Sequence, residues 1–133
     1  MVLFVHMEGK TILIIDDDMA FSEMLSEILK DEGATVFLAH DGEEGVSAAE
    51  EIHPDLIMCD VMMPRKTGVE VLQTVRSSGW GEATPFLLLT NMNAPEALAT
   101  IQQETAVYTD CLLKTDWTLD QIAAKLKEVL AGA

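Results

Sequence analysis

The stretch "LIMCDVMMPRKTG", residues 56–68, contains an unbroken apolar run that ends on a single carboxylate, Asp60. A short continuous apolar run bounded by turn residues indicates a strand that is buried on both faces. Pro64 follows four residues later and stiffens the chain that leaves the strand. Whether Asp60 is a turn residue or a functional group depends on which other side chains the fold brings beside it.

The rest of the chain alternates between strand-like and helix-like apolar patterns. Continuous or nearly continuous apolar runs predict strands at residues 11–15, 34–39, 55–59, 85–90 and 106–113. Helical spacing predicts helices at residues 19–31, 43–51, 67–77, 94–104 and 118–131. Strands that alternate with helices and are apolar on both faces predict an α/β fold, with helices on both faces of a parallel sheet. If the strand order is 2-1-3-4-5, the first and third strands are neighbours.

Composition narrows the class of protein. The 133 residues include eight Lys and Arg against 23 Asp and Glu, a net charge of −15. Direct binding to nucleic acid needs clustered basic residues and is not expected. Because no apolar run approaches the roughly 18 residues of a membrane span and the opening residues do not resemble a signal sequence, we expect a cytoplasmic protein without membrane contact. The predicted organisation is an N-terminal extension at residues 1–9 and one domain at residues 10–131.

Polar residues end four of the five predicted strands. Three aspartates, residues 16–18, follow the first strand, Asp60 follows the third, Thr90 ends the fourth and Lys114 follows the fifth. In an open parallel sheet the carboxyl ends of the strands meet at one edge, where ligands bind. Clustered carboxylates repel one another unless a cation or a proton intervenes, and an all-oxygen set suits Mg²⁺. A hydroxyl and an ammonium can hold phosphoryl oxygens, so the set points to phosphoryl transfer.

Each of these residues also has an ordinary structural explanation. The aspartate triplet could cap the following helix, and Asp60 could be a turn residue. Thr90 could satisfy the backbone at a strand end, and Lys114 could be solvated. The ordinary explanation weakens for the set as a whole, because independent loops would each have to place a suitable group on the same edge.

Four motifs occur in order along the chain: ILIIDDD, DVMMPRKTG, LLLT and LLK. With these motifs the chain, from about Lys10 to Leu130, resembles a response-regulator receiver domain of two-component signalling, in the CheY-like superfamily. The resemblance implies a flavodoxin-like (βα)5 fold, with a five-stranded parallel sheet in the order 2-1-3-4-5. It also implies that Asp60 accepts a phosphoryl group from a histidine of a sensor kinase or a histidine phosphotransfer protein.

The same resemblance implies roles for the neighbouring residues. Asp17, Asp60 and the backbone carbonyl of Met62 would bind Mg²⁺, with Asp16 acting through water. Thr90 and Lys114 would hold the phosphoryl oxygens.

Phosphorylation would act at a distance rather than by enzymatic turnover. The signal would pass to an unknown downstream protein through the face formed by the fourth helix, fifth strand and fifth helix, roughly residues 94–130. We expect a monomer or a weak dimer.

The chain departs from the family pattern at three positions. Thr115 follows the lysine where proline is usual, Cys111 replaces an aromatic residue that takes part in activation, and Asn91 stands where a small residue is favoured. Tyr108 is expected to face away from the position of Cys111, because the two are an odd number of residues apart in a strand. These departures affect the expected readout more than the expected chemistry.

Three alternatives follow from the same residues. A receiver-like scaffold that is never phosphorylated would fit the three departures, although a scaffold has no need of clustered carboxylates. A haloacid-dehalogenase-type phosphatase would use the aspartates at 16–18, but it would leave Asp60 and Pro64 unexplained. A flavin binder would need a hydroxyl-rich phosphate loop where the aspartates stand.

Overall fold

The computed structural model describes residues 7–91, 95, 98–99 and 109–132, and within them five strands form one parallel sheet. The strand order is β2-β1-β3-β4-β5, as the sequence predicts. The strands are β1 (Thr11–Ile15), β2 (Thr35–Ala39), β3 (Leu56–Asp60), β4 (Phe86–Thr90) and β5 (Thr109–Leu113). The described helices are α1 (Met19–Asp31), α2 (Gly42–Ile52), α3 (Gly68–Ser77), α5 (Leu119–Gly132) and the short 3-10 helix η1 (Lys114–Asp116).

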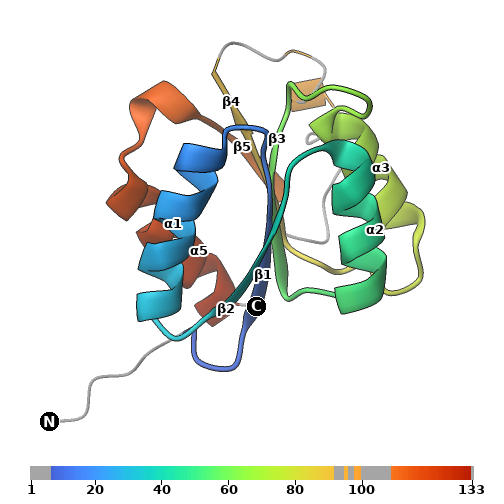
Figure 1. Cartoon of the computed structure of the whole chain (residues 1–133). Coiled ribbons are helices and arrows are strands. Elements are labelled where there is room, and N and C mark those ends of the chain that lie inside the picture. Colours follow the sequence, from blue (N-terminus) through green and yellow to red (C-terminus); the bar gives the residue numbers. More distant parts are fainter. Residues whose placement is uncertain (1–6, 92–94, 96–97, 100–108, 133) are drawn as a thin grey trace, which may run out of the picture.

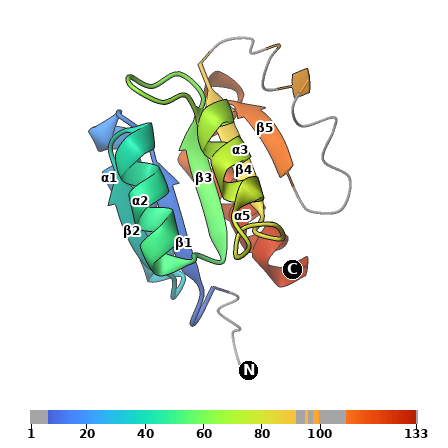
Figure 2. The same ribbon diagram turned by 90° about the vertical axis from the view of Figure 1, so that its right-hand side faces the viewer.

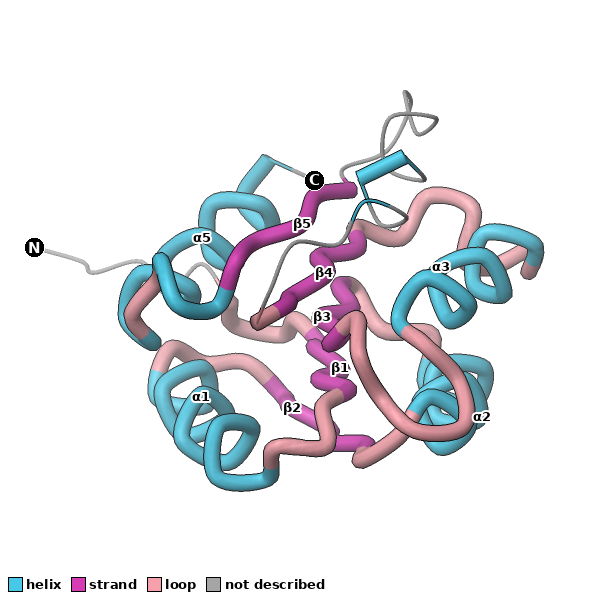
Figure 3. Tube along the Cα trace, turned by 90° about the horizontal axis from the view of Figure 1, so that it is seen from above, coloured by secondary structure: helices cyan, strands magenta, loops and turns pink. Residues whose placement is uncertain are grey.

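The helices cover both faces of the sheet, which confirms the predicted α/β class. Helices α1 and α5 lie on one face, and α2 and α3 lie on the other (Figures 1 and 2). Seen from above, the strands run between these two helical layers (Figure 3). Ile12 and Ile14 of β1 pack in the core beneath α1 and α5, whereas Leu13 and Ile15 pack in the core beneath α2 and α3. The strand therefore buries both its faces, as its continuous apolar run indicates.

Element boundaries agree with the prediction to within one or two residues where the chain is described. Most of the predicted helix at 94–104 lies outside the described residues, as do residues 106–108 of the predicted fifth strand. The 3-10 turn at Lys114–Asp116 was not predicted, because three residues carry no periodic signal. None of the helices in the described ranges combines the length and apolarity that a membrane span requires.

The start of the described chain packs against the domain. The side chain of Met7 is fully buried in the core between the sheet and the α1–α5 layer. The backbone N–H of Lys10 donates to the carbonyl of Met7 at 3.0 Å, which turns the chain into β1. The domain boundary at residue 10 stays a prediction.

The loop between β3 and α3 is held close to the end of β3. The backbone N–H of Gly68 donates to the carbonyl of Val61 at 2.9 Å, so the loop closes on itself. Thr67 and Glu70 form a capping box that starts α3 at this point. A Cβ atom on Gly68 would overlap the backbone carbonyl oxygen of Asp60, so only glycine allows this approach.

We expect Gly68→Ala to destabilise the protein, because the added methyl group must displace the backbone at Asp60. The free energy of unfolding, measured by urea denaturation, should fall by about 1–3 kcal/mol. Gly79→Ala is the matched control, since nothing lies within 4 Å of a Cβ at that position. Equal stability of the two variants would contradict this explanation of the loop.

Candidate functional site

Three carboxylates meet at the carboxyl edge of the sheet. Asp16 follows β1 and Asp60 ends β3, and the two strands pair in parallel with Ile15 opposite Cys59. Asp16, Asp17 and Asp60 each offer an oxygen, and these oxygens all lie within 4.8 Å of one another. The switch point of the strand order therefore brings together the acidic residues that the sequence singled out.

The two buried members of this cluster have different partners. Asp16 is fully buried, and its Oδ1 accepts a hydrogen bond from the backbone N–H of Asp18 at 2.9 Å. Its Oδ2 lies 2.7 Å from Lys114 Nζ, but the contact lacks hydrogen-bond alignment, so this oxygen has an ionic partner and no aligned donor. Asp60 is 5% exposed, and its Oδ1 accepts a long hydrogen bond of 3.4 Å from the backbone N–H of Met62.

Lys114 enters the site from the end of β5. Its ammonium group lies 2.7 Å from Asp16 Oδ2 and 3.9 Å from Asp60 Oδ2, so it is closer to Asp16. The side chain is only 9% exposed, and the ammonium also lies over the ring of Phe21, 4.4 Å from the ring centroid. A lysine that was expected to be solvated on the ordinary explanation is therefore enclosed by two carboxylates and an aromatic ring.

The pKa of the Asp60 carboxyl is raised to about 7 from an ordinary value of 3.8. Burial is the largest cause, because it removes water that would solvate the charge, and the neighbouring charge of Asp16 is the second. Lys114 and the N–H of Met62 act in the opposite direction but do not cancel these effects. Without a cation, Asp60 therefore holds a proton in part near neutral pH.

Thr90 and Met62 complete the predicted set. Thr90 ends β4, which pairs with β3, and its side chain is buried at the same edge. The N–H of Val61 donates to the carbonyl of Leu89 at 2.7 Å, which extends the pairing past Asp60. Met62 follows in the loop with a side chain that is 61% exposed.

The donor set fits Mg²⁺. The clustered groups are carboxylates only, and hard divalent cations prefer oxygen ligands. A buried carboxylate oxygen without an aligned donor and a second carboxylate with a raised pKa are both features that a cation would relieve. Asp16, Asp17 and Asp60 would hold it.

Asp18, the third aspartate of the triplet, has the ordinary structural role. It is the N-cap of α1, and its side chain accepts a hydrogen bond from the backbone N–H of Phe21. The ring of Phe21 is a contact of the site that sequence reasoning missed. Its apolar character at helical spacing is indistinguishable from that of a core residue.

Two of the departures from the family pattern border a cleft beside Lys114. The cleft has a volume of about 300 Å³. Its lining residues are Asp18, Phe21, Asn91, Lys114, Thr115, Trp117 and Leu119. Asn91 and Thr115 therefore stand at the entrance to the lysine rather than in the carboxylate cluster itself.

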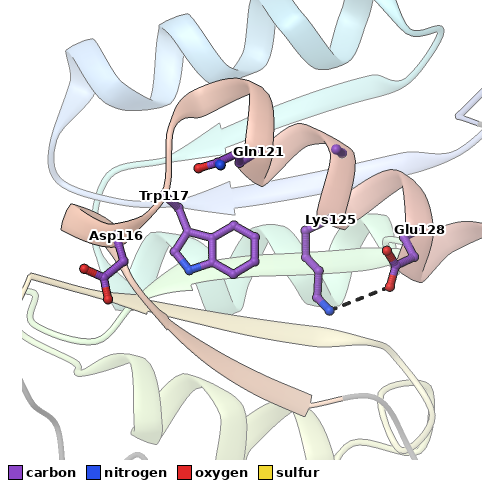
Figure 4. Close-up of a pocket in the computed structure, with 6 residues that line it drawn as sticks. Asp116, Trp117, Gln121, Lys125 and Glu128 are labelled. Atoms are coloured by element: carbon purple, nitrogen blue, oxygen red, sulfur yellow. Dashed lines mark ion pairs between the residues drawn. The ribbon is translucent and has the colours of Figure 1, made fainter.

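A second cleft, of about 500 Å³, lies along α5 and shares Trp117 with the first. The indole of Trp117 lies at one side of it, with Lys125 and Glu128 further along the helix (Figure 4). The Nζ of Lys125 lies 3.8 Å from Glu128 Oε1. The backbone N–H of Trp117 donates to the carbonyl of Lys114 at 3.3 Å. This hydrogen bond connects the backbone of Trp117 to that of the lysine.

Comparison with known proteins places the chain among signalling domains. The family model of the response regulator receiver domain matches residues 12–127. Response regulator MprA of Mycobacterium ulcerans (strain Agy99) is 36% identical over 120 residues, which are 90% of this chain and 49% of that protein. The structure of the chemotaxis protein CheY4 of Vibrio cholerae matches with a TM-score of 0.79 and 31% identity, covering 90% of this chain and 98% of that one.

A third protein shares the fold and was solved with a metal. The receiver domain of the sensor histidine kinase PA1611 from Pseudomonas aeruginosa PAO1 matches with a TM-score of 0.78 and 23% identity, covering 94% of this chain and 99% of that one. In that protein a magnesium ion is coordinated in the active-site cleft. The chain spans about half the length of this response regulator MprA.

The raised pKa of Asp60 predicts how stability changes with pH when divalent cations are removed. Between pH 3.8 and about 7 the folded carboxyl keeps a proton that the unfolded chain has lost. The folded state then binds more protons, so this group makes the free energy of unfolding fall as pH rises through that range. We expect Asp60→Asn to be more stable than the wild type by ~2 kcal/mol at pH 8, and by much less at pH 4.

Urea denaturation in EDTA at the two pH values measures this difference. A ¹³C NMR titration of the Asp60 carboxyl should give a midpoint near 7. A midpoint near 4 would contradict the electrostatic description of the site.

Proposed function

The chain belongs to the response regulator receiver domain family, and from this premise we propose that Asp60 accepts a phosphoryl group from a phosphohistidine. The donor would be a sensor histidine kinase or a histidine phosphotransfer protein. The observation that carries the proposal is the position of the Asp60 carboxylate, 3.9 Å from Lys114 Nζ and within the cluster formed with Asp16 and Asp17. This set combines a nucleophile, a place for a cation and a positive charge for the incoming oxygens.

The reaction transfers one phosphoryl group between two side chains. A carboxylate oxygen of Asp60 attacks phosphorus, the bond between phosphorus and the donor imidazole nitrogen breaks, and an acyl phosphate forms. The imidazole leaves with the electron pair of the broken bond and takes a proton from solvent when it requires one. Mg²⁺ in the carboxylate cluster would neutralise charge and hold phosphoryl oxygens. Asp60 must be ionised to attack. Because its pKa is raised, a cation that favours the ionised carboxylate would also favour the reaction.

Lys114 and Thr90 would receive the new phosphoryl oxygens. The ammonium of Lys114 is 3.9 Å from Asp60 Oδ2, so a small movement away from Asp16 brings it within hydrogen-bond distance of a group on Asp60. Thr90 ends the neighbouring strand and offers a hydroxyl donor at the same edge. Both side chains would stabilise the acyl phosphate and would move toward it. Such a local movement can shift the domain between two conformations.

The signal would leave through the face that includes β5 and α5. The described part of this face contains the α5 cleft, whose Trp117 is hydrogen-bonded to the backbone of Lys114. A movement of Lys114 would therefore be transmitted to Trp117, three residues later, which lines this cleft. The downstream partner is a protein that we expect to carry basic residues, because the chain has a net charge of −15. We propose a signalling domain at residues 10–131 that does not turn over a substrate of its own.

The first test is phosphorylation by a small donor. Acetyl phosphate with Mg²⁺ should add the mass of one phosphoryl group to the wild-type protein in intact-mass spectrometry, and EDTA should prevent the addition. Asp60→Asn should gain no such mass, since the nucleophile is absent. Asp18→Asn is the matched control, because this aspartate caps α1 and should leave phosphorylation intact. An unmodified wild type would instead favour a scaffold that is never phosphorylated.

The fluorescence of Trp117 should report events at Lys114. In a Trp80→Phe background, Mg²⁺ with beryllofluoride should change the emission of the remaining indole, which lines the cleft beside the lysine. Trp80 stacks on His53, with ring centroids 4.7 Å apart, and phenylalanine preserves that contact. Asp60→Asn should abolish the beryllofluoride response. An unchanged emission in the Trp80→Phe protein would argue against a link between the site and the α5 cleft.

A further inference from the structure

We propose that Phe21 is the positioning residue of Lys114, and that the face of its ring keeps the ammonium directed at the carboxylate edge. The ammonium lies 4.4 Å from the ring centroid and 2.7 Å from Asp16 Oδ2. The inference rests on the proposed function, because it concerns the lysine that would receive the phosphoryl oxygens.

The ring and the carboxylates together confine the ammonium. A cation above an aromatic face is attracted by the negative charge density of the ring, and the attraction grows when both groups are withdrawn from water. Lys114 is 9% exposed, so the contact is largely desolvated. The ring has no net charge, so it attracts the ammonium less strongly than a carboxylate or a phosphoryl oxygen does. The ammonium of Lys114 could therefore leave Asp16 for a phosphoryl oxygen while it stays in contact with the ring of Phe21.

The surrounding chain explains why such a contact is needed. The lysine stem has four methylene groups and many conformations. Lys114 starts a single 3-10 turn, and Thr115 after it is exposed. The cleft of about 300 Å³ beside the lysine offers its ammonium a way into solvent, and Phe21 lines that cleft. Removing the ring would let the ammonium occupy the cleft.

The main alternative is that Phe21 only fills space. Its side chain is partly buried and packs against the core between the sheet and the α1–α5 layer. Leucine would preserve this packing and remove the aromatic face, whereas tyrosine would preserve both. The backbone N–H of Phe21, which caps α1 through Asp18, is the same in every variant.

The experiment separates the lysine from the metal. In wild type, Phe21→Leu and Phe21→Tyr, two affinities are measured by calorimetry: Mg²⁺ alone, and beryllofluoride at saturating Mg²⁺. We expect Phe21→Leu to weaken beryllofluoride binding about 5-fold while Mg²⁺ affinity changes less than about 2-fold. Phe21→Tyr should stay within about 2-fold of the wild type for both ligands. Met24→Leu is the matched control, since this side chain of α1 is 57% exposed.

A second measurement does not depend on phosphoryl chemistry. The ε-methylene protons of Lys114 should be shifted upfield by the ring current in wild type and Phe21→Tyr, and this shift should be lost in Phe21→Leu. Phe21→Met serves as a second ringless variant should the leucine variant unfold. Equal weakening in the leucine and tyrosine variants, no weakening in the leucine variant, or no ring-current shift in wild type would each overturn the proposal. A ring-current shift without any beryllofluoride binding to wild type would support the contact between Phe21 and Lys114 but would reject the proposed function.

Discussion

Repulsion between neighbouring carboxylates determines the chemistry of the site and the demands on the scaffold around it. Parallel pairing of β1 with β3 forces Asp16 and Asp60 to the same edge, and burial removes the water that would screen their charges. Only a proton, a cation or a basic side chain can relieve this arrangement. The chain supplies Lys114 for Asp16 and leaves Asp60 with a pKa near 7. A bound cation would relieve the repulsion that remains at Asp60.

The scaffold holds this unfavourable arrangement in place with features that lie outside the cluster. Asp60 ends a strand whose five residues are all buried, so the carboxylate cannot retreat without breaking the core. Gly68 lets the following loop pass directly against the backbone of Asp60. The ion pair between Arg65 and Asp41, at 2.8 Å, connects the same loop to the start of α2. Rigid strands and an anchored loop keep the carboxylates close, which loops alone would not do.

Sequence patterns could predict the fold and the edge of the sheet at which the site lies, because both follow from which residues are apolar and where the strands end. They could not assign the three consecutive aspartates, since the division between a fully buried Asp16 and a helix-capping Asp18 depends on the direction of each side chain. The contact between Phe21 and Lys114 joins residues 93 positions apart in the sequence, and nothing local to either predicts it. The raised pKa of Asp60 likewise depends on burial that only the packed domain creates.

The unequal surroundings of the two buried carboxylates support the proposal that Asp60 rather than Asp16 is the nucleophile. Asp16 has an N–H donor on one oxygen and an ammonium at 2.7 Å from the other, so each oxygen has a partner, although the second lacks an aligned donor. Asp60 Oδ1 accepts a long hydrogen bond of 3.4 Å from the backbone N–H of Met62, and its Oδ2 lies 3.9 Å from the ammonium. A carboxylate with poorly satisfied oxygens has more to gain from a new bond to phosphorus. In the proposed reaction, Lys114 would leave Asp16 for a phosphoryl group on Asp60, because the ammonium lies between the two carboxylates at 2.7 and 3.9 Å.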